Sequence, residues 1–191
     1  MGVALVKGGN VSLTARAPGL TSVVVGLGWD LVRTGTAFEL DAAAMLVDRS
    51  GQVLSDAHVV FFAHRTSPDG SVHHAGSHLL GTGEGDDEQI EVHLDAVPSE
   101  AARVVFPVAI YDAQRRRQSF GQVRAAHVRV VDRVGGTELA RYDLSSDAAT
   151  ETAMIFGELY RARDHWKFRA VGQGWDSGLR GIAAEHGVHV G

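Results

Sequence analysis

Short runs rich in β-branched and aromatic residues recur along the whole chain, separated by glycine, proline, aspartate or serine. Several alternate apolar and polar residues, as at 90–94 and 127–130, which is the pattern of a strand with one buried and one solvated face. Two sheets of such strands can bury their apolar faces against each other. We therefore predict a mainly β fold, a two-sheet β-sandwich of about nine or more strands around one core. The predicted strands span residues 21–29, 42–47, 58–62, 89–94, 103–111, 126–131, 138–144, 152–160 and 166–172.

Turns and short helices complete the predicted fold. Residues 67–71 carry an Asp-Gly pair and residues 133–137 a Gly-Gly pair, and both are typical of tight hairpin turns. The segment 150–160 contains residues that suit a helix and others that suit a strand, and we favour a strand. One helix is predicted near the C-terminus, at 177–186, and a short turn of helix after Pro98.

Size and composition exclude several classes of protein. With 191 residues, 45% of them hydrophobic, and no linker-like tract, the chain is expected to form one domain over residues 1–191. A net charge of −5 disfavours nucleic acid as a partner. The absence of cysteine excludes disulfides and thiolate metal sites. Because no apolar run is long enough for a membrane span or a signal-peptide core, we expect no membrane insertion and a cytoplasmic location.

The most informative segment is the glycine-rich, acidic stretch at 76–88. Its last five residues include four acids, Glu84, Asp86, Asp87 and Glu88, which account for all but one unit of the net charge of −5. Carboxylates about 5 Å apart repel each other by roughly 3 kcal/mol at an effective dielectric of 20. A hard divalent cation would relieve that repulsion, and calcium accepts many oxygen ligands in flexible geometry. The glycines would let the backbone curl around such an ion.

One loop rarely supplies a whole calcium shell, so further carboxylates at strand ends are candidates. Asp30 follows the run 26–29, and Glu39 and Asp41 alternate with apolar residues so that both point to one side of a strand. The alternative interpretation is a solvated acidic turn whose glycines only permit tight geometry. The candidate metal ligands are therefore seven acids, Asp30, Glu39, Asp41, Glu84, Asp86, Asp87 and Glu88.

Other chemistries find less support in the sequence. The hairpin at 67–71 would place His64 and His73 on one face, but scattered histidines on solvent-facing strand positions are commoner than ligand sets. No hydrolase, zinc-protease or phosphate-loop motif is present, so we predict no enzyme and no catalytic residues. We also expect no deep polar pocket away from the acidic stretch.

Taken together, several motifs resemble the TerD family of tellurium-resistance and stress-response proteins. The matching pieces cover almost the whole chain in order, at 7–13, 26–30, 38–42, 81–88, 120–123, 138–144, 151–161 and 166–174. The resemblance implies a bacterial, calcium-binding β-sandwich without catalytic activity, with other stress-response proteins of the Ter type as partners. It leaves the oligomeric state open.

The chain departs from the family pattern at several positions. That pattern is similar to F-D-L-D-A and G-D-N-x-T-G-x-G-D-G-D-D-E, whereas this chain has Glu39, Ser77, His78, Leu80 and Glu84 in place of Asp, Asp, Asn, Thr and Asp. We therefore predict a calcium site weaker than the family's, or one of two sites lost. Two functions follow from this. One is a calcium-binding module that orders loops for partner binding, and the other is a calcium-independent structural or assembly domain of the same family.

Overall fold

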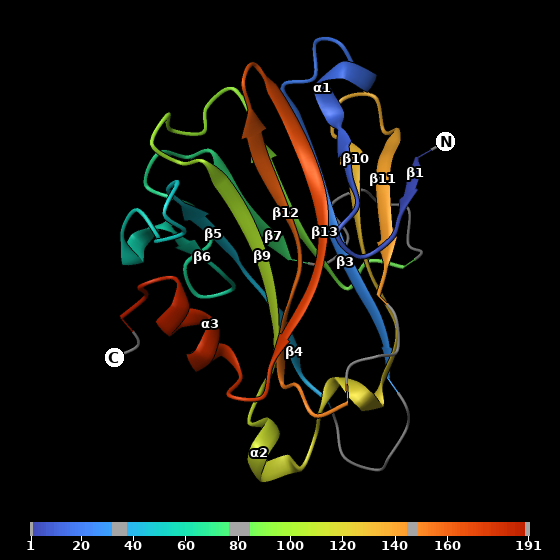
Figure 1. Ribbon diagram of the computed structural model, residues 1–191, viewed down its shortest axis with the longest axis vertical. Coiled ribbons are helices and arrows are strands. Elements are labelled where there is room, and N and C mark those ends of the chain that lie inside the picture. Colours follow the sequence, from blue (N-terminus) through green and yellow to red (C-terminus); the bar gives the residue numbers. More distant parts are fainter. Residues whose placement is uncertain (1, 32–37, 77–84, 145–148, 190–191) are drawn as a thin grey trace.

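The computed structural model describes residues 2–31, 38–76, 85–144 and 149–189. These residues form the predicted β-sandwich, with one sheet of six strands and one of seven (Figure 1). The first sheet has the order β1-β11-β10-β3-β8-β7, with strands β1 (Val3–Leu5), β11 (Glu138–Asp143), β10 (Val123–Asp132), β3 (Ser22–Leu31), β8 (Glu88–His93) and β7 (Val72–Gly76). Its neighbouring strands are antiparallel apart from β1, which runs parallel to β11.

The second sheet has the order β2-β13-β12-β9-β5-β6, and β4 pairs with β9 beside β5. Its strands are β2 (Asn10–Ser12), β13 (His165–Trp175), β12 (Ala153–Ala162), β9 (Arg103–Ile110), β4 (Leu40–Ala42), β5 (Ala44–Val47) and β6 (Val59–Val60). The described helices are α1 (Leu13–Arg16), α2 (Ala113–Arg116), α3 (Leu179–Glu185) and the 3-10 turns η1 (Asp56–His58) and η2 (Phe120–Gln122). None of the helices in the described ranges is long and apolar enough to span a membrane.

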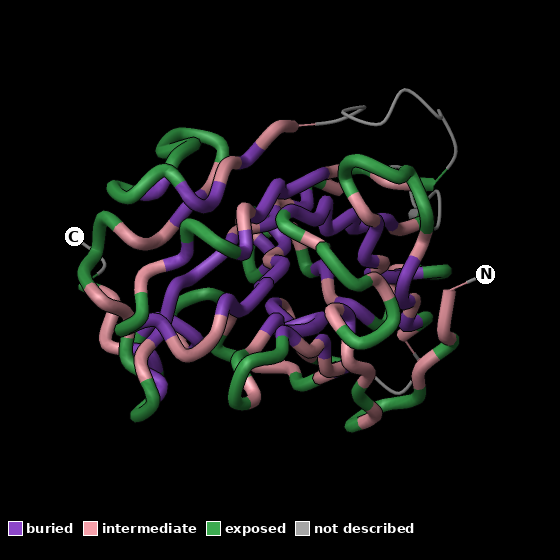
Figure 2. Tube along the Cα trace, turned by 90° about the horizontal axis from the view of Figure 1, so that it is seen from above, coloured by how far each residue is buried: buried purple, intermediate pink, exposed green. Residues whose placement is uncertain are grey.

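The main core lies between the two sheets, where buried residues gather in the middle of the molecule (Figure 2). Period-two alternation places Val23, Val25 and Leu27 of β3 on the inner face of the first sheet. Phe106 and Phe156 of the second sheet belong to the same core and are fully buried. Truncating either ring to alanine should cost about 3–5 kcal/mol, since no neighbour can refill that volume.

A second, smaller apolar cluster covers the outer face of the second sheet. Met45, Val105 and Ile155 point away from the main core and pack under Ile182 of α3. The sequence predicted one core, and this second cluster shows how a helix of about two turns is held against the sheet. Gly187 has φ +69° directly after the helix, as expected of a residue that ends one.

Most predicted elements formed, and the differences occur at their edges. All nine predicted strand runs contain a strand, including the ambiguous segment 150–160, but 42–47 lies across β4 and β5 and the run 58–62 keeps only the two residues of β6. Both hairpin turns formed, with Gly70 and Gly136 at positive φ. The helix predicted after Pro98 was wrong, because that segment makes only a turn closed by the Ala101 N–H on the Pro98 carbonyl. The sequence missed the short strands β1, β2 and β7.

Candidate metal centre

Two glycines of β3 let the acidic segment cross the outer face of the first sheet. A Cβ on Gly26 would lie 2.2 Å from Oδ2 of Asp86, and one on Gly28 would lie 1.8 Å from the carbonyl oxygen of Gly85. The Asp87 N–H donates to the Leu27 carbonyl at 2.8 Å, so β8 begins against β3 at this point. Only glycine fits at such close approach. Gly26 thus makes room for the Asp86 carboxylate and Gly28 for the Gly85 carbonyl.

Asp86 has its charge balanced by the protein itself. Its side chain is 2% exposed, and both carboxylate oxygens accept hydrogen bonds from Arg129, at 2.8–3.1 Å. Gln89 Nε2 donates at 2.9 Å, and His127 Nε2 lies 3.4 Å from Oδ1. Burial alone would raise the pKa of Asp86, but the hydrogen bonds from His127, Arg129 and Gln89, with the charge of Arg129, hold it well below its ordinary value. Asp86 is thus an ionised carboxylate with a resident cation.

The neighbouring Asp87 has a different environment. It is exposed, and its Oδ2 accepts the backbone N–H of Trp29 at 2.7 Å. Partial desolvation raises the pKa of Asp87 despite that hydrogen bond, and the negative charges of Asp30 and Asp86 raise it further. Asp30 is also exposed at the end of β3. Asp30 and Asp87 therefore form a pair of solvent-accessible carboxylates that repel each other.

A second acidic group lies where β4 meets the end of β8. Glu88 Oε2 accepts the Ala42 N–H at 2.7 Å and lies 3.2 Å from Nε2 of the buried His74, so one carboxylate ties the two sheets together. Desolvation raises the pKa of the nearby Asp41, as do the charges of Glu88 and Glu39, while His74 lowers it. Glu39 itself is exposed and makes an ion pair with Arg116 at 3.0 Å.

The predicted ligands thus fall into two groups, joined by the consecutive residues 86–88. In the described part of the chain, no lysine or arginine makes an ion pair with Asp30, Asp41 or Asp87. No three histidine, aspartate or glutamate side chains converge there as a preformed metal shell. Glu84 lies outside the described residues, as do Ser77, His78 and Leu80. The arrangement provides oxygen donors and excess negative charge, the chemistry that a hard cation prefers.

Sequence reasoning identified the acids but missed what surrounds them. Arg129 and His127 alternate on β10, and the register that pairs them with Gly26 and Gly28 puts both beside Asp86. The alternation was visible in the sequence, whereas the register was not. The histidine alternative finds no support among the described residues, because His64 contacts the Ala57 carbonyl and His73 the Thr66 hydroxyl.

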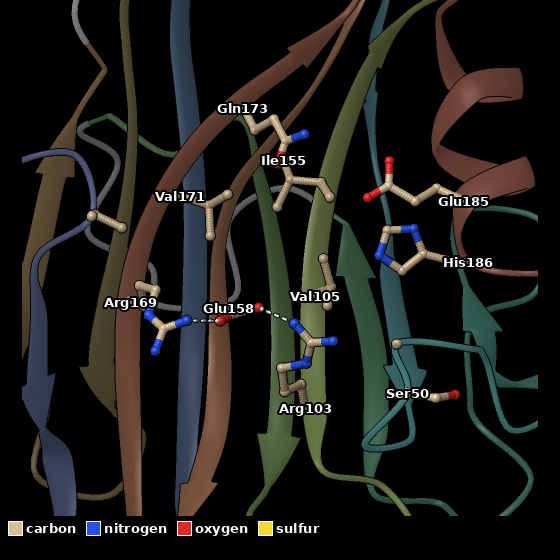
Figure 3. A pocket seen from close by; sticks show the side chains of 13 residues that line it. Ser50, Arg103, Val105, Ile155, Glu158, Arg169, Val171, Gln173, Glu185 and His186 are labelled. Atoms are coloured by element: carbon tan, nitrogen blue, oxygen red, sulfur yellow. Dashed lines mark hydrogen bonds and ion pairs between the residues drawn. The ribbon is translucent and has the colours of Figure 1, made fainter.

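Contrary to the expectation of no polar pocket away from the acidic stretch, a polar cavity of about 350 Å³ lies on the outer face of the second sheet (Figure 3). Glu158 lies at its centre, 5% exposed, between Arg103 at 3.3 Å and Arg169 at 3.1 Å. Glu185 and His186 line the opposite wall, at the end of α3. On the sheet, two arginines balance the one carboxylate of Glu158, so this cluster has no excess negative charge and lies apart from the acidic groups described above.

Comparisons with known proteins agree with this architecture. The TerD domain model matches residues 1–186. The chain is 54% identical over 191 residues to tellurium resistance protein TerD of Serratia marcescens and 46% identical over 193 aligned residues to general stress protein 16U of Bacillus subtilis, and each match covers both chains completely. A crystal structure of a TerD homologue from Streptomyces coelicolor superposes with a TM-score of 0.66 at 27% identity, covering 91% of this chain and all of that one. The chain therefore belongs to the TerD family, whose relatives here are named for tellurium resistance and the general stress response.

Proposed function

We propose that this protein is a non-enzymatic, cytoplasmic stress-response protein that binds calcium at the acidic end of the sandwich, and that the ion orders the surrounding loops for binding to other stress-response proteins. The observation that supports it is the contrast within residues 86–88. Asp86 has Arg129 as its counter-ion, whereas Asp87 and the nearby Asp41 face further carboxylates and have raised pKa values. Bound calcium would supply the missing positive charge.

The described residues fit calcium in part. Asp30 and Asp87 offer accessible oxygens on one side, and Asp41 and Glu88 offer them on the other. We assign Asp86 a positioning role, because its oxygens already accept hydrogen bonds from Arg129 and Gln89. Its fixed position holds the next two residues of the segment in place.

Several features point to a weakened site. Glu39 is turned to Arg116, and the described carboxylates do not form a ready-made shell of three. Ligation through Asp30, Asp41, Asp87 and Glu88 would then require these groups to approach one another when the ion binds. The free-energy cost of this rearrangement lowers the affinity for calcium, so we expect binding weaker than that of a preformed calcium site.

The alternative is a calcium-independent structural or assembly domain. The ion pairs Asp86–Arg129 and Glu39–Arg116 favour it, because each uses a protein cation where an acid of the predicted ligand set would otherwise need a metal. In that case the remaining acids are solvated side chains at the end of the sandwich.

Calorimetric titration of chelator-treated protein with calcium, together with thermal unfolding, separates the two functions. If only the folded state binds, calcium at 100 times Kd stabilises by about 2.7 kcal/mol, which raises Tm by roughly 5–10 °C. Asp87→Asn should abolish both signals, whereas Asp95→Asn, a change in an exposed turn, should leave them intact. The absence of heat and of a Tm shift at millimolar calcium would remove the calcium function and leave the structural one.

A further inference from the structure

An open apolar groove lies beside α3 on the outer face of the second sheet. It has a volume of about 570 Å³, within the range of sites that bind ligands. Its floor is made of the small residues Ala43, Pro107 and Ala109, next to the part of the sheet that α3 covers. Because the floor residues are small, the groove has room for bulky side chains from another molecule.

Large apolar side chains surround that floor and remain exposed. Phe62 is 55% exposed, Tyr111 56% and Leu179 50%, and all three line the groove. Among the described residues only Val6 and Val134 are comparable, and neither of them lines it. Exposed aromatic and aliphatic side chains that gather in one depression mark an interaction surface more often than chance.

The charged side chains among the described lining residues of the groove are all acidic. They are Asp41, Asp56 and Asp112, and Tyr111 and His189 are the other titratable lining groups. No lysine or arginine is among the described lining residues, although the Arg116 guanidinium lies over the Tyr111 ring, 5.1 Å from its centre. Asp56 contacts His189 at 3.3 Å and Asp112 pairs with Arg115 beyond the lining, while no lysine or arginine of the described ranges makes an ion pair with Asp41. An apolar floor with an acidic rim is complementary to apolar side chains flanked by basic ones.

We propose that this groove is the docking site for an amphipathic helix of a partner protein, with its apolar face on Ala43, Pro107 and Ala109 and lysine or arginine residues at the rim near Asp41. The helical form is inferred from α3, which covers the adjacent part of the same sheet face with Ile182 and Ala183. A second helix laid beside α3 would complete that layer, as helices commonly cover sheet faces.

This inference deepens the proposed function by naming the surface that a partner would contact. Asp41 lines the groove and also belongs to the acidic group at the end of β4, so calcium and the helix would affect each other there. The apolar contacts of the groove do not require calcium. Binding of a helix can therefore be tested in chelator and in calcium as separate arms.

The test uses the full chain and a fluorescently labelled synthetic peptide of leucine and lysine, with leucines spaced to form one helical face. Fluorescence anisotropy measures its Kd, and hydrogen exchange maps the protected segments. The double variant Phe62→Ser with Leu179→Ser should weaken binding by at least about fivefold, the effect of losing apolar anchors. The matched double variant Val6→Ser with Val134→Ser removes equally exposed apolar residues elsewhere and should leave Kd within about twofold.

Two further peptides test the stated chemistry. A scrambled leucine–lysine peptide has the same charge without an apolar face, and a leucine–glutamate peptide has the face with the opposite charge, so both should bind weakly. Equal binding of either one would overturn the proposal. Protection that falls outside the groove in the wild-type chain would do the same, and this readout holds even if the double variant fails to fold.

Two other occupants are possible outcomes that contradict the proposal. If sedimentation shows a dimer that is lost in Phe62→Ser with Leu179→Ser, the groove is occupied by a second copy of the chain. If only small apolar dyes bind there, it is a small-molecule pocket. If the peptide binds in chelator and the calcium titration gives no signal, the groove is a docking site and the proposal that the protein binds calcium is contradicted.

Discussion

The end of the sandwich and the adjoining outer face of the first sheet both carry crowded carboxylates, but on the outer face the buried acids are paired with arginines. There Asp86 is paired with Arg129, and the buried Glu91 with Arg133 and His93. At the end of the sandwich, the charged groups that shift the pKa values of Asp41 and Asp87 are other carboxylates, which raise them, and histidines, which lower them. Sequence distance does not separate the two regions, because Asp86 and Asp87 are consecutive. The directions of their side chains separate them, since Asp86 lies over Gly26 and pairs with Arg129, whereas Asp87 accepts the Trp29 N–H.

The second sheet also pairs a buried acid with arginines. Glu158 is almost fully buried on its outer face, and Arg103 and Arg169 from the two neighbouring strands hold one carboxylate oxygen each (Figure 3). In these described examples, an acid buried on a sheet face is paired with a cation from another strand of the same sheet or from the turn that follows one. Asp30, Asp41 and Asp87 at the sandwich end are more exposed and make no ion pair with a described lysine or arginine, which is why we propose an ion from solution as their counter-charge.

The largest effect is expected when the best-paired acid is removed. Asp86→Ala leaves the guanidinium of Arg129 without its bidentate partner in a site where the arginine side chain is only 17% exposed. Breaking a buried ion pair in this way costs about 3–5 kcal/mol. Urea unfolding at neutral pH measures the loss, with Asp95→Ala in an exposed turn as the control. A loss below about 1 kcal/mol, the range of surface pairs, would show that Asp86 is not an internal counter-ion.

A smaller loss is expected on the second sheet. Glu158→Gln keeps the size of the side chain but removes the charge shared by Arg103 and Arg169, whose side chains are 33% and 43% exposed. Because water can solvate both arginines in part, we expect a loss of about 1–3 kcal/mol by urea unfolding. The matched change Glu100→Gln, in an exposed turn, should be neutral. Calcium should not alter the effect of Glu158→Gln on the free energy of unfolding. An effect that depends on calcium would show that Glu158 is coupled to the acids at the sandwich end.

Substitutions at the sandwich end should have the opposite sign. In chelator, Asp41→Asn or Asp87→Asn removes a charge that neighbouring acids repel, so each should leave stability unchanged or raise it by up to about 1 kcal/mol. Asparagine at 87 can still accept the Trp29 N–H. In calcium, both variants should lose the stabilisation that the wild type gains. If either variant is as unstable in chelator as Asp86→Ala, the comparison between the two regions fails.

The sequence predicted the strands better than the contacts between them. Long alternating or apolar runs such as 103–111 and 126–131 could be recognised because burial on one face imposes a period of two. The short strands β1, β2 and β7 could not, since runs of three to five residues carry too little pattern. The four-residue helices α1 and α2 were missed for the same reason.

The same limit applies to the candidate site. Of the seven predicted acids, four were proposed from their crowding at 84–88 and three from their positions at strand ends, and six of the seven lie in the described residues. The sequence could not show which of these acids have a cation of the protein as a partner. Arg129 reaches Asp86 only through the strand register that pairs Arg129 with Gly26. A slip of one residue would turn Arg129 to the other face, and nothing within β10 itself specifies that register.

The smallest expected effect is a pH dependence in chelator. The folded-state pKa values of Asp41 and Asp87 are raised above the ordinary 3.8, so the folded chain binds these two protons more tightly than the unfolded chain does. The repulsion between ionised groups is therefore felt in full at neutral pH, and it is relieved as pH falls through the raised pKa values toward 3.8. Asp86 acts in the opposite sense, because its lowered pKa stabilises the fold above 3.8 and that stability is lost on further acidification.

Relative to the double variant Asp41→Asn with Asp87→Asn, the wild type should gain a few tenths of a kcal/mol of stability between pH 7 and 5, because two partly exposed charges are neutralised by protonation. Urea unfolding of both proteins across that range measures the difference, and millimolar calcium should reverse its sign, since calcium binds the ionised carboxylates and competes with the protons. A difference that does not change with pH in chelator would mean that these carboxylates are already neutralised within the protein, and the contrast with Asp86 would disappear.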